Sequence, residues 1–483
     1  MLFNSYEFIF LFFPVVLTVY FWLGKYNEHS KANASLVLFS LIFYAYWDVR
    51  FLPLLLISIA ANFLIYKLIS KLKNHNKKSR AKYVFYCGIA FNLGLLGYFK
   101  YFNFFLGTLN DLGANFEILP IILPLGISFF SITQLLFLWD AYASEVEETN
   151  LLNYSLFVSF FPHLLAGPIL YHHQMIRQFK DSSLCKVNWD NFSKGLTLFT
   201  IGLMKKTMIA DALFPYVNFG FANTDEITLF TAWLISVCYM LELYFDFSGY
   251  SDMAVGLAKM LNFDIPINFN APFRATSMIK FWQNWHISLT NALTACIYMP
   301  IMRKFKKPSL RHTIFAASTT MFCVGIWHGA GWTFVIFAAI SAVAVAFNYL
   351  WKQTHIVMPN VLSRFLKLIT ILFGMIFFRA DSVNEAMNVI YAMFGANGII
   401  LQESYFAVKG GLPQLLLPVE NPPGFFFQLA FFLSVLIVSF SPSSNNLVKK
   451  FKPSVLWMFF IGIGFFLSFL AMTKPTEFLY FQF

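Results

Sequence analysis

The stretch GIWHGAGW, residues 325–332, joins two apolar segments at residues 313–327 and 334–351. Each segment approaches the roughly 20 apolar residues that a helix needs to cross a bilayer. The stretch itself carries a titratable side chain, His328, between two tryptophans and among small residues. An ionisable side chain at membrane depth is costly and points to a function by default. The stretch therefore predicts a membrane protein with polar chemistry in its interior.

The composition of the whole chain favours the same class. Of 483 residues, 58% are hydrophobic and 12% are charged, against roughly 25% charged in an average soluble domain. Aromatic residues make up 20% of the chain, which is typical of an interfacial Trp/Tyr belt with further Phe facing lipid or the interior.

The net charge of +11 does not indicate nucleic-acid binding, because the cations lie in short runs between apolar segments, as at residues 71–82 and 303–311. Such runs follow the positive-inside pattern, with anionic membrane lipid as the nearest counter-charge. The run at residues 71–82 is the strongest topological anchor and is expected in the cytoplasm. Counting back three spans places the N-terminus on the periplasmic side, and the loop with Lys25 and Lys31 then falls inside.

The apolar segments expected to form membrane helices are residues 8–23, 34–47, 51–69, 83–98, 119–139, 152–171, 196–217, 228–245, 313–327, 334–351, 365–378, 424–440 and 455–472. Residues 119–139 and 152–171 contain internal Pro and Gly, which predicts broken helices that are buried in protein or line a cavity. The first segment has no basic region before it, so it is interpreted as a retained span. The longest polar stretches, residues 140–150, 180–194 and 402–423, are too short to separate a soluble domain. We therefore expect a single all-α membrane domain over residues 1–483.

The cysteines and the usual catalytic signatures narrow the chemistry further. Five cysteines are isolated, and no CxxC or metal-spaced pair occurs, so neither a disulfide framework nor a metal site is expected. The sequence contains no GxSxG elbow, P-loop, HExxH or GxGxxG after a strand. Any chemistry is therefore expected to use histidine and carboxylate groups in the membrane.

His328 is the sharpest candidate for a catalytic group. The small residues around it leave room for backbone or ligand to approach the imidazole, and Trp327 and Trp332 can form walls. Histidine is the side chain best suited to move protons near neutral pH. The alternative is an interfacial histidine between belt tryptophans, and the residues alone do not separate the two interpretations.

A second candidate is IKFWQNWHISL, residues 279–289. On one helix, Phe281 and Trp285 share a face and Lys280 and Asn284 share another, with His286 between the two stripes. This pattern predicts an amphipathic helix at an interface or along a cavity. For Lys280, snorkelling at the membrane surface is the favoured alternative.

A third candidate is YFDFSGYSD, residues 244–252. Its glycine suggests a sharp bend, and its two carboxylates suggest acid–base work or cation binding. Asp252 fits the positive first turn of a new helix, with Ser248 or Ser251 as N-cap. Asp246 lies between two phenylalanines and is harder to explain as a cap.

Two further polar groups have plainer interpretations. His163, in FFPHLLAGPILY at residues 160–171, is more readily a structural histidine at a broken helix than a ligand or proton carrier. Lys205, Lys206 and Asp211 are expected to pair locally, and the mouth of an anionic substrate site is the less favoured alternative.

Taken in order, ten phrases resemble the membrane-bound O-acyltransferase superfamily, in particular its bacterial alginate O-acetyltransferase-like branch. They are FYAYWDVRFL, LGYFKYFNFF, LPLGISFF, FFPHLLAGPILY, GLMKKTMIAD, YFDFSGYSDMAVGL, FWQNWHISL, WHGAGWTF, FFRADSVNEA and the terminal FLYFQF. The resemblance implies a ring of about 11 tilted transmembrane helices with short re-entrant helices around a central funnel. It also implies that His328 is the required histidine, acting as general base, and that His286 is its upstream counterpart. The residues expected to contact substrate are Trp327, Trp332, Asp246, Asn284, Trp285 and Lys280.

The resemblance further implies that no cofactor is bound and that acetyl-CoA in the cytoplasm donates the acetyl group. The acceptor would be a polysaccharide or a periplasmic SGNH-type acetyltransferase, and the membrane would be the bacterial inner membrane. The chain departs from the family pattern at Gln283 and Asn284, where arginines are usual, and at residues 292–300. Two alternatives stay open: related acyl transfer such as D-alanylation, and a proton-coupled transporter using His286, His328 and Asp246.

Overall fold

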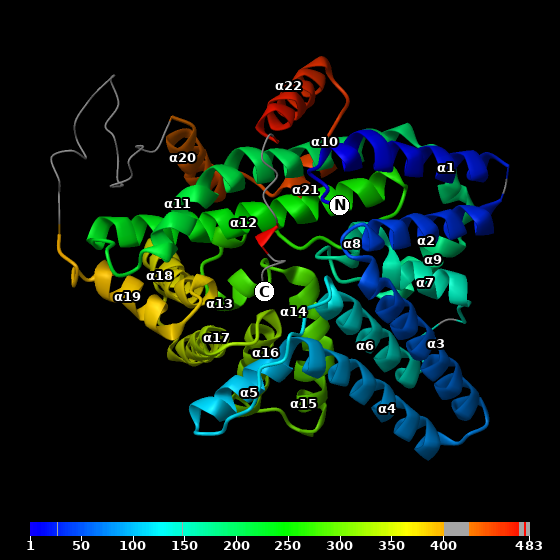
Figure 1. The fold of residues 1–483 in the computed structure, drawn as a ribbon, viewed down its shortest axis with the longest axis horizontal. Helices are drawn as coiled ribbons and strands as arrows, with labels where there is room; N and C mark the ends of the chain where they lie inside the picture. Colours follow the sequence, from blue (N-terminus) through cyan, green and yellow to red (C-terminus); the bar gives the residue numbers. More distant parts are fainter. Residues whose placement is uncertain (27, 147, 400–424, 473–477, 480–483) are drawn as a thin grey trace. The chain divides into compact units, whose positions relative to one another are not determined.

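The computed structural model of the chain describes residues 1–483 except residues 27, 147, 400–424, 473–477 and 480–483. The described residues form helices and connecting loops, with no strand among them (Figure 1). The predicted polar stretch at residues 402–423 and the end of the FLYFQF phrase lie outside the described residues. The all-helical class predicted from the sequence is confirmed.

The pattern of contacts between residues divides the chain into two compact units. The first comprises residues 1–201, 250–268 and 448–461, and the second comprises residues 202–249, 269–447 and 462–483. Helices α10 (Trp189–Met204), α12 (Leu229–Met260), α21 (Ser444–Lys449) and α22 (Val455–Ala471) contribute residues to both. The single-domain interpretation stays a prediction.

The first unit also contains η1 (Phe8–Phe12), α1 (Phe13–Lys25), α2 (His29–Ala45), η2 (Val49–Phe51), α3 (Leu52–Asn74), α4 (Lys78–Leu96), η3 (Gly97–Tyr101), α5 (Phe102–Asp111), α6 (Ile127–Ala143), α7 (Leu151–Ser159), α8 (Phe161–Leu164), α9 (His172–Lys180) and η4 (Ser182–Cys185). Buried phenylalanine rings fill part of its core, with Phe3 5.0 Å from Phe8 and 5.6 Å from Phe43 between ring centroids. A reciprocal pair of amides joins α3 to α4, because each of Asn62 and Asn92 donates to the other at 3.2 and 2.7 Å. Such pairs satisfy polar groups where no water is present.

The two segments expected to be broken are broken. The segment at residues 119–139 becomes helical only at Ile127, after Gly126, whose φ of 73° is open to glycine at little cost. The segment at residues 152–171 is interrupted at Phe160, between α7 and α8, and is not helical after Leu164. Internal proline and glycine thus end helices here, as the sequence predicted.

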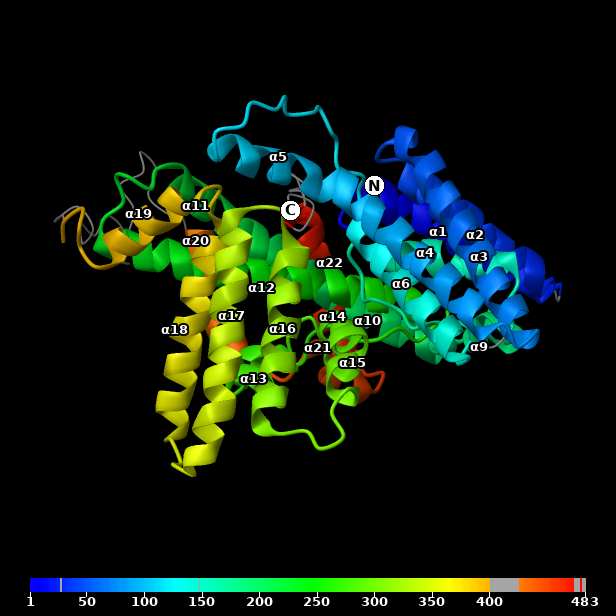
Figure 2. The ribbon, with the colours of Figure 1, turned by 90° about the horizontal axis from the view of Figure 1, so that it is seen from below.

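The second unit contains η5 (Lys205–Ala210), α11 (Asp211–Ala222), η6 (Pro272–Arg274), α13 (Met278–Trp282), α14 (Ile287–Leu293), η7 (Thr294–Tyr298), α15 (Met299–Arg303), α16 (Leu310–His328), α17 (Trp332–Trp351), η8 (Lys352–Thr354), α18 (Asn360–Arg379), α19 (Val383–Met393) and α20 (Phe425–Phe440). Helices α16, α17 and α18 lie side by side (Figures 1 and 2). His328 ends α16, directly before the turn that joins α16 to α17.

Two glycines on α12 allow close helix packing. In the first unit, a Cβ at Gly256 would lie 2.6 Å from the carbonyl oxygen of Gly195 on α10. In the second unit, a Cβ at Gly249 would lie 2.7 Å from the carbonyl oxygen of Gly202. The bend predicted at Gly249 is therefore wrong: α12 runs through this position without interruption, and the missing side chain serves contact with α10.

The chain is a multi-pass membrane protein. Among the described residues, five helices are long and apolar enough to cross a membrane, namely those within residues 8–25, 49–74, 229–260, 332–354 and 360–379. Three more apolar helices of the described part are shorter, at residues 127–143, 428–440 and 455–471. The count of about 11 spans is not reached by length and composition among the described residues, since several helices fall below a full span. The ring around a central funnel stays a prediction.

Candidate active site

His328 is the last residue of α16, and three small residues separate it from α17. Its side chain is buried. The space beside it is filled by protein, since a Cβ at Gly329 would lie 2.1 Å from the ring of Phe334, and one at Gly325 would lie 2.6 Å from the backbone of Ala338. The glycines therefore let α17 pack against α16. The sequence predicted room for backbone or ligand here. The structure shows the backbone of α17 beside Gly325, and room for a ligand stays a prediction.

Aromatic rings surround the His328 imidazole. Its ring centroid lies 5.2 Å from that of Phe378 on α18, 5.3 Å from that of Trp327 and 6.2 Å from that of Phe337 on α17. Three helices thus supply an apolar wall to one titratable group. Such a wall excludes water from the imidazole and strengthens any electrostatic interaction that it makes.

His286 lies in a turn between α13 and α14, not within one amphipathic helix. The helix predicted over residues 279–289 is wrong, because His286 has φ 45° and ψ 53°, a left-handed conformation that breaks the helix. That conformation is uncommon for a side chain other than glycine, although histidine is among the residues found there more often. Part of the expected face survives, since the rings of Phe281 and Trp285 stack at 5.5 Å.

The turn at His286 and the turn after α16 meet. The ring centroid of His286 lies 6.3 Å from that of His328 and 6.1 Å from that of Trp327. The ring of Phe247 on α12 lies 4.7 Å from His286, edge to face. Both histidines are buried. The structure therefore brings together the two histidines that the sequence singled out.

Asp246, which precedes Phe247 on α12, is held by protein groups. Lys206 forms ion pairs with Asp246 at 2.7 Å and with Asp211 at 2.8 Å, and the Leu479 backbone N–H donates to the other Asp246 oxygen at 2.9 Å. The predicted local pairing of Lys206 with Asp211 is confirmed. These contacts give Asp246 a structural part in the second unit, and its role in substrate binding stays a prediction.

The interpretation of Asp252 as a residue in the first turn of a new helix is wrong. Asp252 is buried within α12, which begins at Leu229. His163 has the structural role favoured for it, because its Nε2 lies 2.9 Å from the Phe157 carbonyl oxygen across the break between α7 and α8.

The other predicted contact residues lie in different surroundings. Trp285 and Trp327 are buried beside the histidines. Asn284 is half-buried and donates to the Lys280 carbonyl at 2.7 Å, while the Lys280 side chain is exposed on α13. Trp332 is 51% exposed at the start of α17, so its role as a wall stays a prediction.

Two buried charged residues were not singled out from the sequence. Glu242 lies on α12 with only 2% of its surface exposed. Lys367 on α18 is 3% exposed and donates to the Phe273 carbonyl at 2.6 Å. The available signal was the same for both: a single charge inside an otherwise apolar segment.

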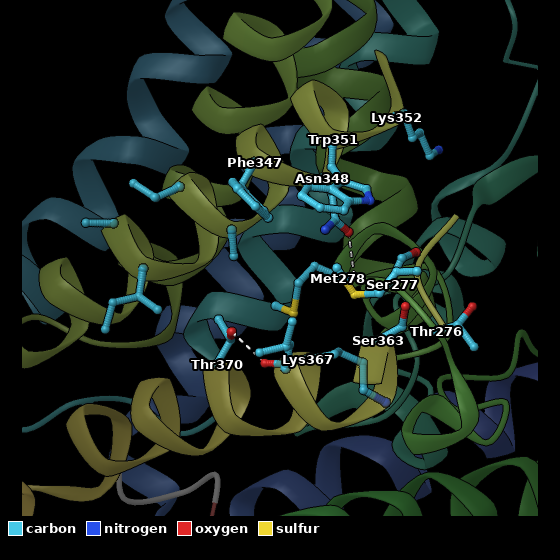
Figure 3. A pocket seen from close by; sticks show the side chains of 16 residues that line it. Thr276, Ser277, Met278, Phe347, Asn348, Trp351, Lys352, Ser363, Lys367 and Thr370 are labelled. Atoms are coloured by element: carbon cyan, nitrogen blue, oxygen red, sulfur yellow. Dashed lines mark hydrogen bonds between the residues drawn. The ribbon is translucent and has the colours of Figure 1, made fainter. Parts of the chain in front are cut away.

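A separate cavity of about 590 Å³ lies between α13, α17 and α18 (Figure 3). Its lining is Thr276, Ser277, Met278, Ala339, Ile340, Val343, Ala344, Phe347, Asn348, Trp351, Lys352, Met358, Ser363, Leu366, Lys367 and Thr370. Asn348 Oδ1 accepts from the Met278 backbone at 2.7 Å, which ties α17 to α13. Val343 and Phe347 are largely exposed. None of the predicted site residues lines this cavity, so it is distinct from the histidine pair.

The helical fold, the broken segments and the paired histidines agree with a membrane acyltransferase. The chain belongs to the membrane-bound O-acyltransferase family, whose sequence model matches residues 39–384. It is therefore an acyltransferase.

Individual relatives are similar over most of the chain. A peptidoglycan O-acetyltransferase of Helicobacter pylori is 37% identical over 83% of this chain and 81% of its own length. The probable alginate O-acetylase AlgI of Pseudomonas aeruginosa is 35% identical over 82% of this chain and 75% of its own length. A teichoic acid D-alanyltransferase of Bacillus subtilis is 24% identical over 49% of this chain and 62% of its own.

Proposed function

We propose that the protein is a membrane O-acetyltransferase that passes an acetyl group from cytoplasmic acetyl-CoA across the bacterial inner membrane. The acceptor is a cell-envelope or exported polysaccharide. The observation that carries the proposal is the pair of buried histidines, His286 and His328, with ring centroids 6.3 Å apart. The O-acetyltransferase relatives support the choice of acyl group.

His328 acts as the general base. A ring nitrogen of His328 takes the proton from the acceptor hydroxyl while the hydroxyl oxygen attacks the thioester carbonyl carbon. The carbon–sulfur bond then breaks, the CoA thiolate leaves, and the proton passes from His328 to that thiolate. The aromatic wall of Trp327, Phe337 and Phe378 disfavours attack by water on the thioester.

His286 positions the reacting groups. Its left-handed backbone fixes the turn between α13 and α14, so the imidazole points toward the end of α16. Residues held in sparsely populated conformations cost about 1–3 kcal/mol and persist where the surroundings enforce them, often at active sites. Trp285 and Trp327 pack beside the pair and contact the substrate.

The donor approaches from the side predicted to be cytoplasmic. Lys280 is exposed on α13, just before His286 in the chain, and further cations follow in residues 303–307. We propose that these cations bind the donor's phosphates. Gln283 and Asn284, where the family usually has arginines, remove two charges at this entrance. A periplasmic SGNH-type acetyltransferase passes the acetyl group on, and the N-terminus lies on the periplasmic side.

Donor competition separates acetyl transfer from D-alanyl transfer, the alternative suggested by the teichoic acid relative. Membranes that contain the full chain are given radiolabelled acetyl-CoA or a D-alanyl-loaded carrier protein. Labelling of envelope polysaccharide from acetyl-CoA alone is expected, and labelling from the carrier alone would overturn the choice of donor. Substrate uptake by proteoliposomes without any acyl donor would instead indicate a transporter.

A further inference from the structure

Three side chains of types that can ligate a metal ion meet in the first unit, whereas the histidine pair belongs to the second unit. Asp140 lies near the end of α6, and His172 and His173 are the first two residues of α9. One ligand atom from each lies within 4.8 Å of the other two. His172 is buried, whereas His173 is exposed. No metal site was predicted from the sequence, because the cysteines are isolated and no metal-spaced pair occurs.

The hydrogen bonding of His172 fixes where its lone pair points. Its Nε2 lies 3.3 Å from the Glu145 carbonyl oxygen, which can only accept, so Nε2 must carry the hydrogen. In the neutral ring Nδ1 is then a bare acceptor. Nδ1 lies 3.0 Å from Asp140 Oδ2, yet it has no hydrogen-bond partner in the part of the chain that the structure describes.

Two acceptors therefore face the same point. A charged imidazolium would direct its Nδ1–H at the carboxylate in hydrogen-bond geometry, and that geometry is not present. A cation bound between Nδ1 and Oδ2 explains why the two acceptors face each other without such a hydrogen bond. We propose that Asp140, His172 and His173 bind one divalent transition-metal ion, for which zinc is the best fit.

The donor set selects the metal. Two imidazole nitrogens and one carboxylate oxygen suit zinc, whereas calcium and magnesium prefer oxygen ligands. Zinc lies about 2.0–2.2 Å from such ligands, which places tetrahedral ligand atoms roughly 3.4 Å apart. The Nδ1–Oδ2 pair is already close to this separation, and the exposed His173 side chain is free to rotate toward it. A water molecule completes the fourth position.

The surroundings resemble the outer shell of a metal site. A ligating histidine usually donates its other N–H to a carbonyl or carboxylate, as His172 does to Glu145. The ring of Phe137 covers His172 edge-on at 5.6 Å. The ion ties α9 to the end of α6, where Lys73 of α3 also contacts the Tyr142 carbonyl. Its role is structural, and it does not depend on the proposed acetyl transfer.

Metal binding by the purified full chain tests the site. After treatment with a chelator, the protein is titrated with Zn²⁺ and, separately, with Co²⁺ as a spectroscopic probe. Wild type is expected to bind one zinc ion per chain and to show the Co²⁺ absorption bands of a tetrahedral site. His173→Ala, which changes an exposed side chain, is expected to weaken binding at least about tenfold, and Asp140→Asn likewise.

His75→Ala serves as the matched control, because His75 is exposed and lies outside the cluster. The His75→Ala variant should bind zinc as wild type does. Zinc should raise the melting temperature of wild type and of His75→Ala, but not that of His173→Ala. Equal zinc affinity in wild type and His173→Ala would overturn the proposal. So would the absence of ligand-field bands with Co²⁺ in wild type. Acetyl transfer is not measured, so the outcome is independent of the proposed function.

Discussion

Replacing Lys206 with methionine tests the buried charge network that Lys206 forms with Asp246 and Asp211. Lys206 is 4% exposed and neutralises two carboxylates, Asp246 at 2.7 Å and Asp211 at 2.8 Å. Removing one partner of a buried ion pair typically costs about 3–5 kcal/mol, because the remaining charge is left uncompensated. Two carboxylates lose their cation here, so we expect a loss at the upper end of that range.

A surface pair of similar length supplies the control. Lys194 lies 2.6 Å from Asp190, but their side chains are 30% and 60% exposed. Exposed pairs contribute about 0–1 kcal/mol, since water screens them. Lys194→Met should therefore change the free energy of unfolding far less than Lys206→Met, although its ion pair is no longer than either pair of Lys206.

The assay unfolds the purified chain in mixed micelles by titration with a denaturing detergent, and the free energy of unfolding is measured. Adding Asp246→Asn to Lys206→Met should restore part of the lost stability, because it removes one stranded charge. A difference of less than about 1 kcal/mol between the free energies of unfolding of Lys206→Met and Lys194→Met would contradict a buried ion-pair network at Lys206.

Three further predictions concern other parts of the chain. Gly256→Ala should destabilise the first unit, because its Cβ would lie 2.6 Å from the Gly195 carbonyl oxygen; a melting temperature equal to that of wild type would contradict this close packing. Hydrogen bonds from Ser183 hold the pKa of Asp181 below its usual value. The stabilisation from Asp181 should thus be present above about pH 4 and be lost at lower pH, and a cost of Asp181→Ala in thermal melts that did not shrink on acidification would refute it. His286→Asn keeps a residue that tolerates the left-handed turn but should reduce acetyl transfer about 10²-fold; unchanged transfer at normal protein level would remove His286 from the site.

Much of the fold follows from local chemistry that the sequence displays. Proline and glycine interrupt the apolar segments as expected, since residues 119–126 are not helical and α8 ends at Leu164. The pairing of Lys206 with Asp211 was also predictable, because the two residues are close in the chain. The contact of His163 with the Phe157 carbonyl oxygen is also local, because the two residues are six apart in the chain.

The errors arose where a distant element decides the conformation. Gly249 ends no helix, because α10 packs against the space left by its missing side chain. His286 leaves the predicted helix through a left-handed turn that no periodicity could show. Both positions depend on contacts or turns that the local residue pattern does not show.

The resemblance to the family named both histidines, but the sequence did not predict that they meet. No repeating residue pattern relates positions 286 and 328. Their proximity depends on how α13, α14, α16 and α17 pack. Residue spacing alone therefore gave two separate candidates, and the tertiary structure makes them one site.

The role of His328 as general base is tested by the initial rate of acetyl transfer from acetyl-CoA by the purified full chain in lipid nanodiscs. His328→Ala should lower the rate at least about 10²-fold, the scale of a lost general base, while the protein folds and inserts normally. His75→Ala, which changes an exposed histidine outside the site, should leave the rate unchanged. A His328→Ala rate within a few-fold of wild type would contradict the assignment of His328 as the base.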